Sequence, residues 1–174
     1  RPDKAEIISI YNPTEEVKSL NNYYISDSEF YYEIQSDNNP SPGNTISDFM
    51  AKFPDNINIQ PGDSLILSIH PEYQDIYGSD FVADLNLQTD MEETEDGSFG
   101  LGNTSTTLDR LDDDQECIIL FKWDGISENE VEDVDYFIWG DISYAVNKTN
   151  IFGYLPDTEP ELQDYFTTIH DDYE

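Results

Sequence analysis

Carboxylates are the side chains of this chain whose type and spacing best suit the binding of a metal ion. Calcium is held in proteins by about six to eight oxygen atoms from carboxylates and carbonyls, and carboxylates crowded on one loop can supply them. The sequence therefore predicts a solvated acidic loop that is also a candidate calcium site, at Asp109, Asp112, Asp113, Asp114 and Glu116. A second acidic group comes earlier in the chain, at Asp90, Glu92, Glu93, Glu95 and Asp96. Neither group has the spacing of an EF-hand loop.

Side chains that could serve in nucleophilic catalysis are few. The two histidines are His70 and His170, and neither accompanies a serine or cysteine in a nucleophile motif. We expect His70, at the end of a predicted strand, to be a partly exposed polar residue. The single cysteine, Cys117, begins an apolar run and is expected to be a buried small hydrophobe. The sequence therefore predicts a protein that is not an enzyme and has no cofactor besides calcium, while a hydrolase that uses loop carboxylates stays open as the catalytic alternative.

The charge balance is strongly acidic, with 39 aspartates and glutamates against 7 lysines and arginines and a net charge of -32 at pH 7. Such a surface repels the phosphates of nucleic acids and of anionic lipids and attracts cations, so we expect no nucleic-acid partner. No stretch is apolar over the roughly 18 residues that a membrane-spanning helix needs, so we expect no direct membrane insertion. Three origins of the charge stay open: adaptation to a salty medium, binding of divalent ions, or an acidic surface that keeps the protein soluble.

Short apolar runs separated by turn residues predict an all-β fold. In residues 5–27, Ile8 and Ile10 are expected to share one face of a first strand, which Pro13 ends because proline has no amide donor. A turn at Pro61-Gly62 and a short helix over 71–78 are also expected. The other predicted strands cover residues 30–34, 64–70, 81–87, 117–123 and 134–140. This pattern favours an antiparallel β-sandwich over a parallel α/β sheet.

Part of the pattern resembles the lamin tail domain family. The opening strand of that family, with its tyrosine-asparagine-proline ending, is similar to residues 6–13 (EIISIYNP) of this chain. The next strand of the family, which runs from leucine to serine-aspartate, is similar to residues 20–27 (LNNYYISD). The turn and strand at 59–67 and the closing hairpin of 117–125 with 134–140 also match the family's pattern.

The chain also departs from that family. Ile7 stands where tryptophan is usual, Ser9 where glutamate is usual and Asn22 where glycine is common. The acidic residues 88–116 and the segment 127–130 look like insertions.

The resemblance implies an immunoglobulin-like antiparallel β-sandwich over residues 1–140. Residues 141–174 would form a C-terminal extension that packs on the sandwich or extends it. The resemblance further implies a non-catalytic interaction or tethering module of a secreted or cell-surface bacterial protein, with a protein or a glycan as its partner. A carbohydrate-binding or adhesive module, with calcium as a structural ion and exposed aromatic residues as its platform, is the alternative.

Overall fold

The computed structural model describes residues 3–35, 48–94, 111–112, 115–126 and 131–140 of the 174-residue chain. Within this part the chain forms short strands and little helix. In chain order, with η for a 3-10 helix, the elements are η1 (Asp3–Ala5), β1 (Ile7–Tyr11), β2 (Lys18–Ser19), β3 (Tyr23–Ser26), η2 (Tyr31–Gln35), β4 (Met50–Lys52), β5 (Asn58–Ile59), β6 (Ser64–Ser68), α1 (Gln74–Tyr77), β7 (Leu85–Asn86), β8 (Glu92–Glu93), β9 (Glu116–Lys122) and β10 (Glu132–Trp139).

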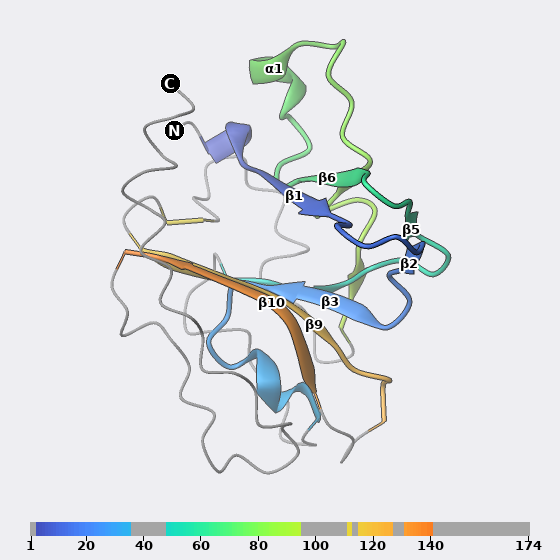
Figure 1. Ribbon diagram of the computed structural model, residues 1–174. Coiled ribbons are helices and arrows are strands. Elements are labelled where there is room, and N and C mark those ends of the chain that lie inside the picture. Colours follow the sequence, from blue (N-terminus) through green and yellow to red (C-terminus); the bar gives the residue numbers. More distant parts are fainter. Residues whose placement is uncertain (1–2, 36–47, 95–110, 113–114, 127–130, 141–174) are drawn as a thin grey trace.

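The strands form two main sheets that lie one above the other (Figure 1). One sheet has the order β1-β6-β7 and the other has the order β10-β9-β3-β4-β8, while β2 and β5 form a short separate ladder. The predicted all-β sandwich is therefore confirmed at the level of architecture. The expected antiparallel pairing holds except between β6 and β7, which are parallel. A parallel pair needs a crossover connection, and residues 70–84, which include α1, provide it.

The main core fills the space between the two sheets. Leu65, Leu67 and Ile69 are buried there, as their alternation along β6 predicts, and Ile8 and Ile10 of β1 pack against them. The face of the first strand that was predicted to be apolar is thus the inward one. The buried residues of this cluster are Leu20, Ile25, Phe49, Ala51, Phe53, Ile59, Leu65, Leu67, Ile69, Leu85, Leu87, Met91, Ile118 and Leu120.

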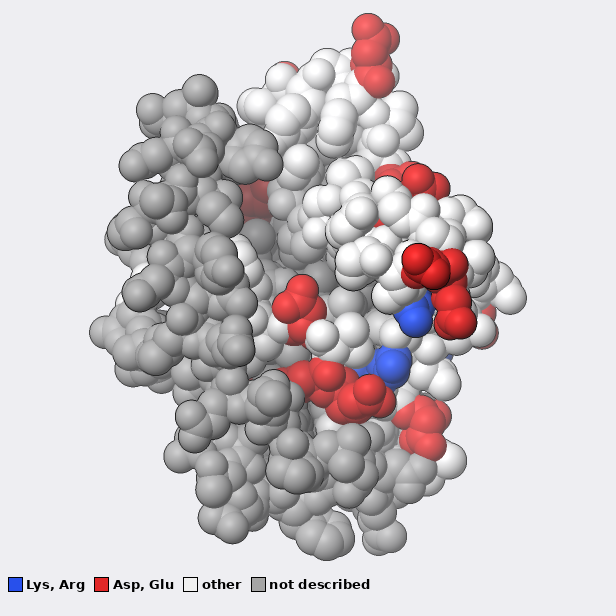
Figure 2. Space-filling view, in the orientation of Figure 1, with Lys and Arg blue, Asp and Glu red and all other residues white. Residues whose placement is uncertain are grey.

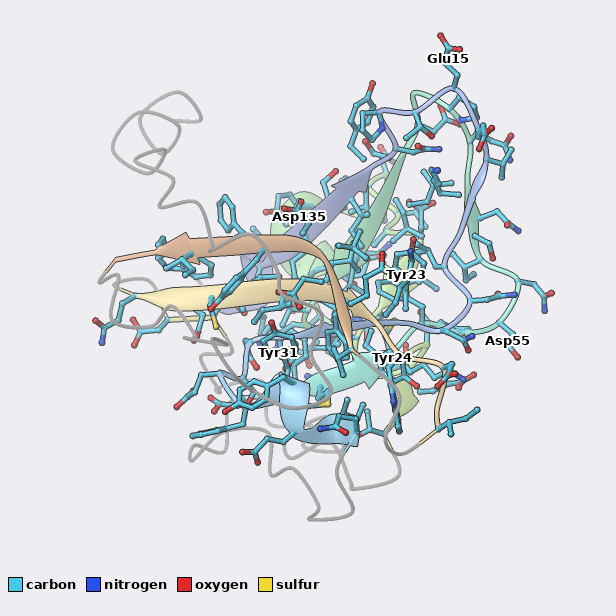
Figure 3. All side chains as sticks on the ribbon, turned by 60° about the horizontal axis from the view of Figure 1, so that its bottom comes forward. Glu15, Tyr23, Tyr24, Tyr31, Asp55 and Asp135 are labelled. Atoms are coloured by element: carbon cyan, nitrogen blue, oxygen red, sulfur yellow. The ribbon has the colours of Figure 1, made fainter. Side chains whose placement is uncertain are left out.

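A second core lies on the opposite face of the five-stranded sheet. Cys117, Ile119 and Phe121 of β9 alternate with the main-core residues, so this strand is buried on both faces. Tyr31 closes the second core from η2. Its ring is tilted against that of Phe121, with 5.1 Å between the ring centroids, and its hydroxyl donates to the Asp133 carboxylate at 2.8 Å. Figure 3 shows Tyr31 on η2, beneath the ribbons of β9 and β10.

Two predicted strands differ from the structure. Residues 30–34 were expected to be extended, but Tyr31–Gln35 forms a 3-10 helix. The helix forms because its spacing of three places Tyr31 and Ile34 together in the second core, and this burial outweighs the strand preference of the aromatic residues. In residues 81–87, only Leu85–Asn86 pairs as a strand.

The predicted turns and the predicted short helix are confirmed. β1 ends at Tyr11, and buried Asn12 then fixes the turn: its Nδ2 donates to the carbonyls of Glu16 (2.8 Å) and Ile59 (3.0 Å), and its Oδ1 accepts from the Thr14 amide at 3.1 Å. Gly62 has a φ of 76°, which the position after Pro61 in this turn requires.

Several expectations fall on residues outside the described part of the chain. They include the C-terminal extension of 141–174, most of the acidic segment after residue 94, and the segment 127–130. Among the described residues, no helix is long and apolar enough to cross a membrane.

Candidate functional site

The predicted calcium group is only partly described. Glu116 begins β9 and accepts the Cys117 amide proton at Oε1 (3.0 Å), while the carbonyl of Asp112 accepts the indole N–H of Trp139 at 2.7 Å. Outside the described residues lie Asp109, Asp113 and Asp114. Within the described ranges, no three histidine, cysteine, aspartate or glutamate side chains are grouped so as to hold a metal ion. The calcium site therefore stays a prediction of the sequence.

The second acidic group has local structural roles where it is described. Asp90 accepts the amide proton of Asn86 at 2.7 Å, and Glu92 forms an ion pair with Lys52 at 3.2 Å. Outside the described residues lie Glu95 and Asp96. These contacts join β7 and β4 to their neighbouring segments.

A buried carboxyl group that the sequence analysis missed lies where β3 ends. Asp27 is only 2% exposed; its Oδ1 accepts the Phe49 amide proton at 2.6 Å, and its Oδ2 is buried without a hydrogen-bond partner among the described residues. Burial raises the pKa of Asp27 well above its ordinary value, and the charges of Asp48 and Glu116 add to this effect. A charged residue directly after the apolar run of β3 is the sequence signal that could have identified it.

Glu116 experiences the same environment. Burial raises its pKa to about 7, and the negative charge of Asp48 adds to the rise. The raised pKa values of Asp27 and Glu116 therefore share two causes, burial of the carboxyl groups and the negative charge of Asp48.

His70 differs from its expected position. It is fully buried, and its Nε2 lies 3.7 Å from Oε2 of Glu6, whose Oε1 accepts the Leu111 amide proton at 3.2 Å. The expectation of a partly exposed residue is therefore wrong. The pairing of β1 with β6 continues to the residue before His70, since the Ile69 amide donates to the Glu6 carbonyl at 3.0 Å.

Cys117 is buried, as predicted. Its Sγ donates to the carbonyl oxygen of Asp27 at 3.3 Å, and burial raises the pKa of the thiol far above its ordinary value. The side chain therefore has the character of a small hydrophobe and not of a nucleophile.

Acidic side chains dominate the charged surface in the view of Figure 2. Most described lysines pair with carboxylates: Lys4 with Glu72 and Asp75, Lys52 with Glu92, and Lys122 with Glu132. The ammonium group of Lys122 also lies over the ring of Tyr23, 5.0 Å from its centroid. Unneutralised negative charge therefore remains over much of the surface.

Large apolar side chains are exposed in two notable places. The first is the crossover between β6 and β7, which projects from the sandwich in Figure 1 and carries Ile76, Tyr77 and Val82, the last of these 71% exposed. Phe81 packs against Tyr77 there, with 4.9 Å between the ring centroids. The second is the inner face of β10, where Phe137 is 40% exposed.

The exposed face of β10 follows from the unequal widths of the two sheets. Asp135 and Phe137 pair with Leu120 and Ile118 of β9, and cross-strand partners share a face, so all four side chains point toward the sheet of β1. The two β9 residues are buried, but Asp135 and Phe137 are exposed, because the three-stranded sheet does not extend over β10. We call this face, formed by Asp135, Phe137 and Trp139, the β10 shelf.

One edge of β1 is paired with no strand of the described residues, and this edge lies on the same side of the sandwich as the β10 shelf. Residues 111–112 join the two, because the Leu111 amide bonds to Glu6, just before β1, and the Asp112 carbonyl bonds to Trp139 at the end of β10. Figure 1 shows both strands facing the viewer, one in each sheet. This arrangement exposes aromatic and carboxylate groups along two sheet edges. Comparisons with protein-family models, with curated proteins and with solved structures find no match to this chain.

Proposed function

We propose that this chain is a non-catalytic interaction module that binds another protein through the β10 shelf and the adjoining edge of β1. The observation that carries the proposal is the exposure of Phe137 on a face that points toward the opposite sheet. A side chain at that position normally belongs to a sandwich core. Its exposure identifies a place where a further layer of protein would bury apolar surface.

The contacts around the β10 shelf favour a protein as the partner. Trp139 is held by its bond to the Asp112 carbonyl, and its ring lies 5.9 Å from that of Phe137. The two rings are inclined at 55°, so they form a ridge and not a flat platform for a sugar ring. This inclination favours a protein partner over the glycan partner of the alternative proposal.

The proposed cellular setting comes from the resemblance to the lamin tail domain family. A domain of that kind would have an immunoglobulin-like strand order and would tether a secreted or cell-surface protein to a partner. The calcium group of residues 109–116 would stabilise the fold of such a module and would not take part in a reaction.

The test is selection of a random peptide library on the immobilised full chain, with a glycan array in parallel. We expect peptides to be enriched, and we expect Phe137→Ser to abolish their binding. Val82→Ser, which removes an even more exposed apolar side chain from the crossover, is the matched control and should leave binding unchanged. Enrichment of glycans without peptides would replace the proposal by the carbohydrate-binding alternative, and loss of binding in the Val82 variant alone would move the site to the crossover.

A further inference from the structure

The edge of β1 presents backbone groups that the sandwich does not use. Two backbone hydrogen bonds fix the pattern: the Ile69 amide donates to the Glu6 carbonyl, and the Asn12 amide donates to the Asp63 carbonyl, both at 3.0 Å. In an antiparallel pair the residues that exchange these bonds alternate along the strand. Residues 6, 8, 10 and 12 therefore face β6, and the N–H and C=O groups of Ile7, Ser9 and Tyr11 face outward, where no strand of the described chain pairs with them.

β1 also lacks the features that usually protect a sheet edge. Native edge strands are blocked by prolines, charged residues, bulges or very short length. β1 has five residues, IISIY, with no charge and no proline, and its register with β6 is regular. The edge strand of the other sheet shows the protected pattern, since β10 carries Glu132, Asp133 and Asp135 and has a register shift between the last two. β1 is thus the edge that is suited to accept a strand.

A strand added beside β1 would also cover the β10 shelf. Its inward side chains would lie next to Ile8 and Ile10, which are only partly buried, and above Phe137 and Asp135. It would supply the layer that the three-stranded sheet lacks over β10. Backbone pairing and apolar burial would therefore occur together, which is the usual basis of strand addition.

The charge distribution decides what kind of strand this surface fits. Asp135 is exposed on the shelf, and in Figure 3 it projects from β10 on the side of β1. Glu15 and Glu16 are exposed in the turn that follows β1. A second copy of this chain would bring a net charge of -32 against the same charge, and this repulsion opposes a symmetric pairing of two β1 edges. A cationic segment would be attracted instead.

We propose that β1 accepts an extended segment of a partner protein in which lysine or arginine alternates with apolar residues. The segment forms a fourth strand next to β1, places a cationic side chain near Asp135 and buries Phe137. This inference rests on the proposed function and adds to it the mode of binding and the chemistry of the partner.

The test uses the full chain and a synthetic peptide that alternates valine with lysine and is blocked at both ends. We expect the peptide to slow hydrogen exchange at the amides of Ile7, Ser9 and Tyr11. Ser9→Pro removes one outward donor without touching the bonds to β6, and should weaken binding about tenfold while Ser9→Ala leaves it unchanged. Asp135→Asn should weaken binding about threefold at low salt, whereas the control Asp80→Asn, at another exposed site, should not.

Three outcomes would overturn strand addition at β1 or change its partner. Equal binding of the peptide by the wild type and Ser9→Pro, or exchange protection away from β1, would overturn the inference. If library peptides still require Phe137 in that case, the proposed interaction function stands and only the strand-addition mode fails; if no peptide of any kind binds, both fail. Dimers that sedimentation detects in the wild type at low salt but not in Ser9→Pro would assign the edge to a second copy and overturn the cationic partner. Should Ser9→Pro fail to fold, the exchange measurement on the wild type decides.

Discussion

Replacement of Glu116 by glutamine is expected to stabilise the protein at neutral and alkaline pH. Burial raises the pKa of Glu116 to about 7 from an ordinary value of 4.5. That difference corresponds to at most about 3.4 kcal/mol, at about 1.36 kcal/mol for each pH unit. Because Glu116 is only partly buried, solvent screening reduces this value, and we expect Glu116→Gln to raise the free energy of unfolding by about 1–2 kcal/mol at pH 8. Glutamine keeps an oxygen that can accept the Cys117 amide proton, now bound at 3.0 Å.

The sign of the pH dependence follows from linkage. A carboxyl group whose pKa is raised by folding binds more protons in the folded state, so its contribution to stability is complete below about pH 4.5 and is lost as the pH rises through about 7. The wild type and Glu116→Gln should thus be similar in stability near pH 4.5 and should diverge up to pH 8. Asp27, whose pKa is also raised, acts in the same direction in both proteins.

Urea denaturation followed by tryptophan fluorescence, at pH 5 and pH 8 in EDTA, measures the effect. Glu15→Gln is the matched control, since it removes the same charge from an exposed turn. A gain at pH 8 that the Glu15 variant shares equally would mean general charge relief and not burial of Glu116. A loss of stability at pH 8 in calcium, but not in EDTA, would show instead that ionised Glu116 binds the metal and that the calcium prediction is right.

Four further predictions concern the fold and its charge. Gly62→Ala should lower the free energy of unfolding by about 1–2 kcal/mol, measured by urea denaturation, because φ is 76° and no atom lies near enough for an added methyl group to contact. Asn12→Ala should cost about 1–3 kcal/mol in the same assay, because it leaves the Ile59 carbonyl without its side-chain donor; Asn12→Asp, which keeps only the acceptor oxygen, should recover part of the loss. The Cys117 thiol should resist a thiol reagent in the folded protein and react once urea unfolds it, and rapid native labelling would contradict its burial. NaCl should raise the melting temperature by screening a net charge of -32, and a further rise in CaCl2 of equal ionic strength would identify specific calcium binding.

The alternation of apolar residues was sufficient to predict most of the sandwich. It placed Ile8 and Ile10 of β1, and Leu65, Leu67 and Ile69 of β6 and just beyond it, on the inner face, because a strand with one solvated face has a period of two. The same reasoning gave a wrong prediction for the run from Tyr31 to Ile34, which was expected to be a strand. Its aromatic residues favour a strand locally, but burial of Tyr31 and Ile34, three residues apart, favours a 3-10 helix, and sequence gives no measure of that tertiary contact.

The candidate site was less predictable than the fold, for a physical reason. Sequence reasoning looked for carboxylates that are close along the chain, whereas Asp27, Asp48 and Glu116 are brought together by pairing of strands that are distant in sequence. The exposure of Phe137 depends on the relative width of two sheets, which no local pattern encodes. Both features required the register of the strands.

The acidic surface and the edge of β1, which no strand of the described chain pairs with, are best explained together. An uncharged, regular edge strand is a hazard in most proteins because copies of the chain can pair through it. Here the net charge of -32 opposes such pairing at a distance, without any residue of β1 having to block the edge. Repulsion of this kind discriminates by charge, since it excludes acidic copies of the chain and attracts cationic segments. Under the strand-addition proposal, the edge of β1 would therefore accept cationic segments, while the net charge would oppose pairing between two copies of the chain.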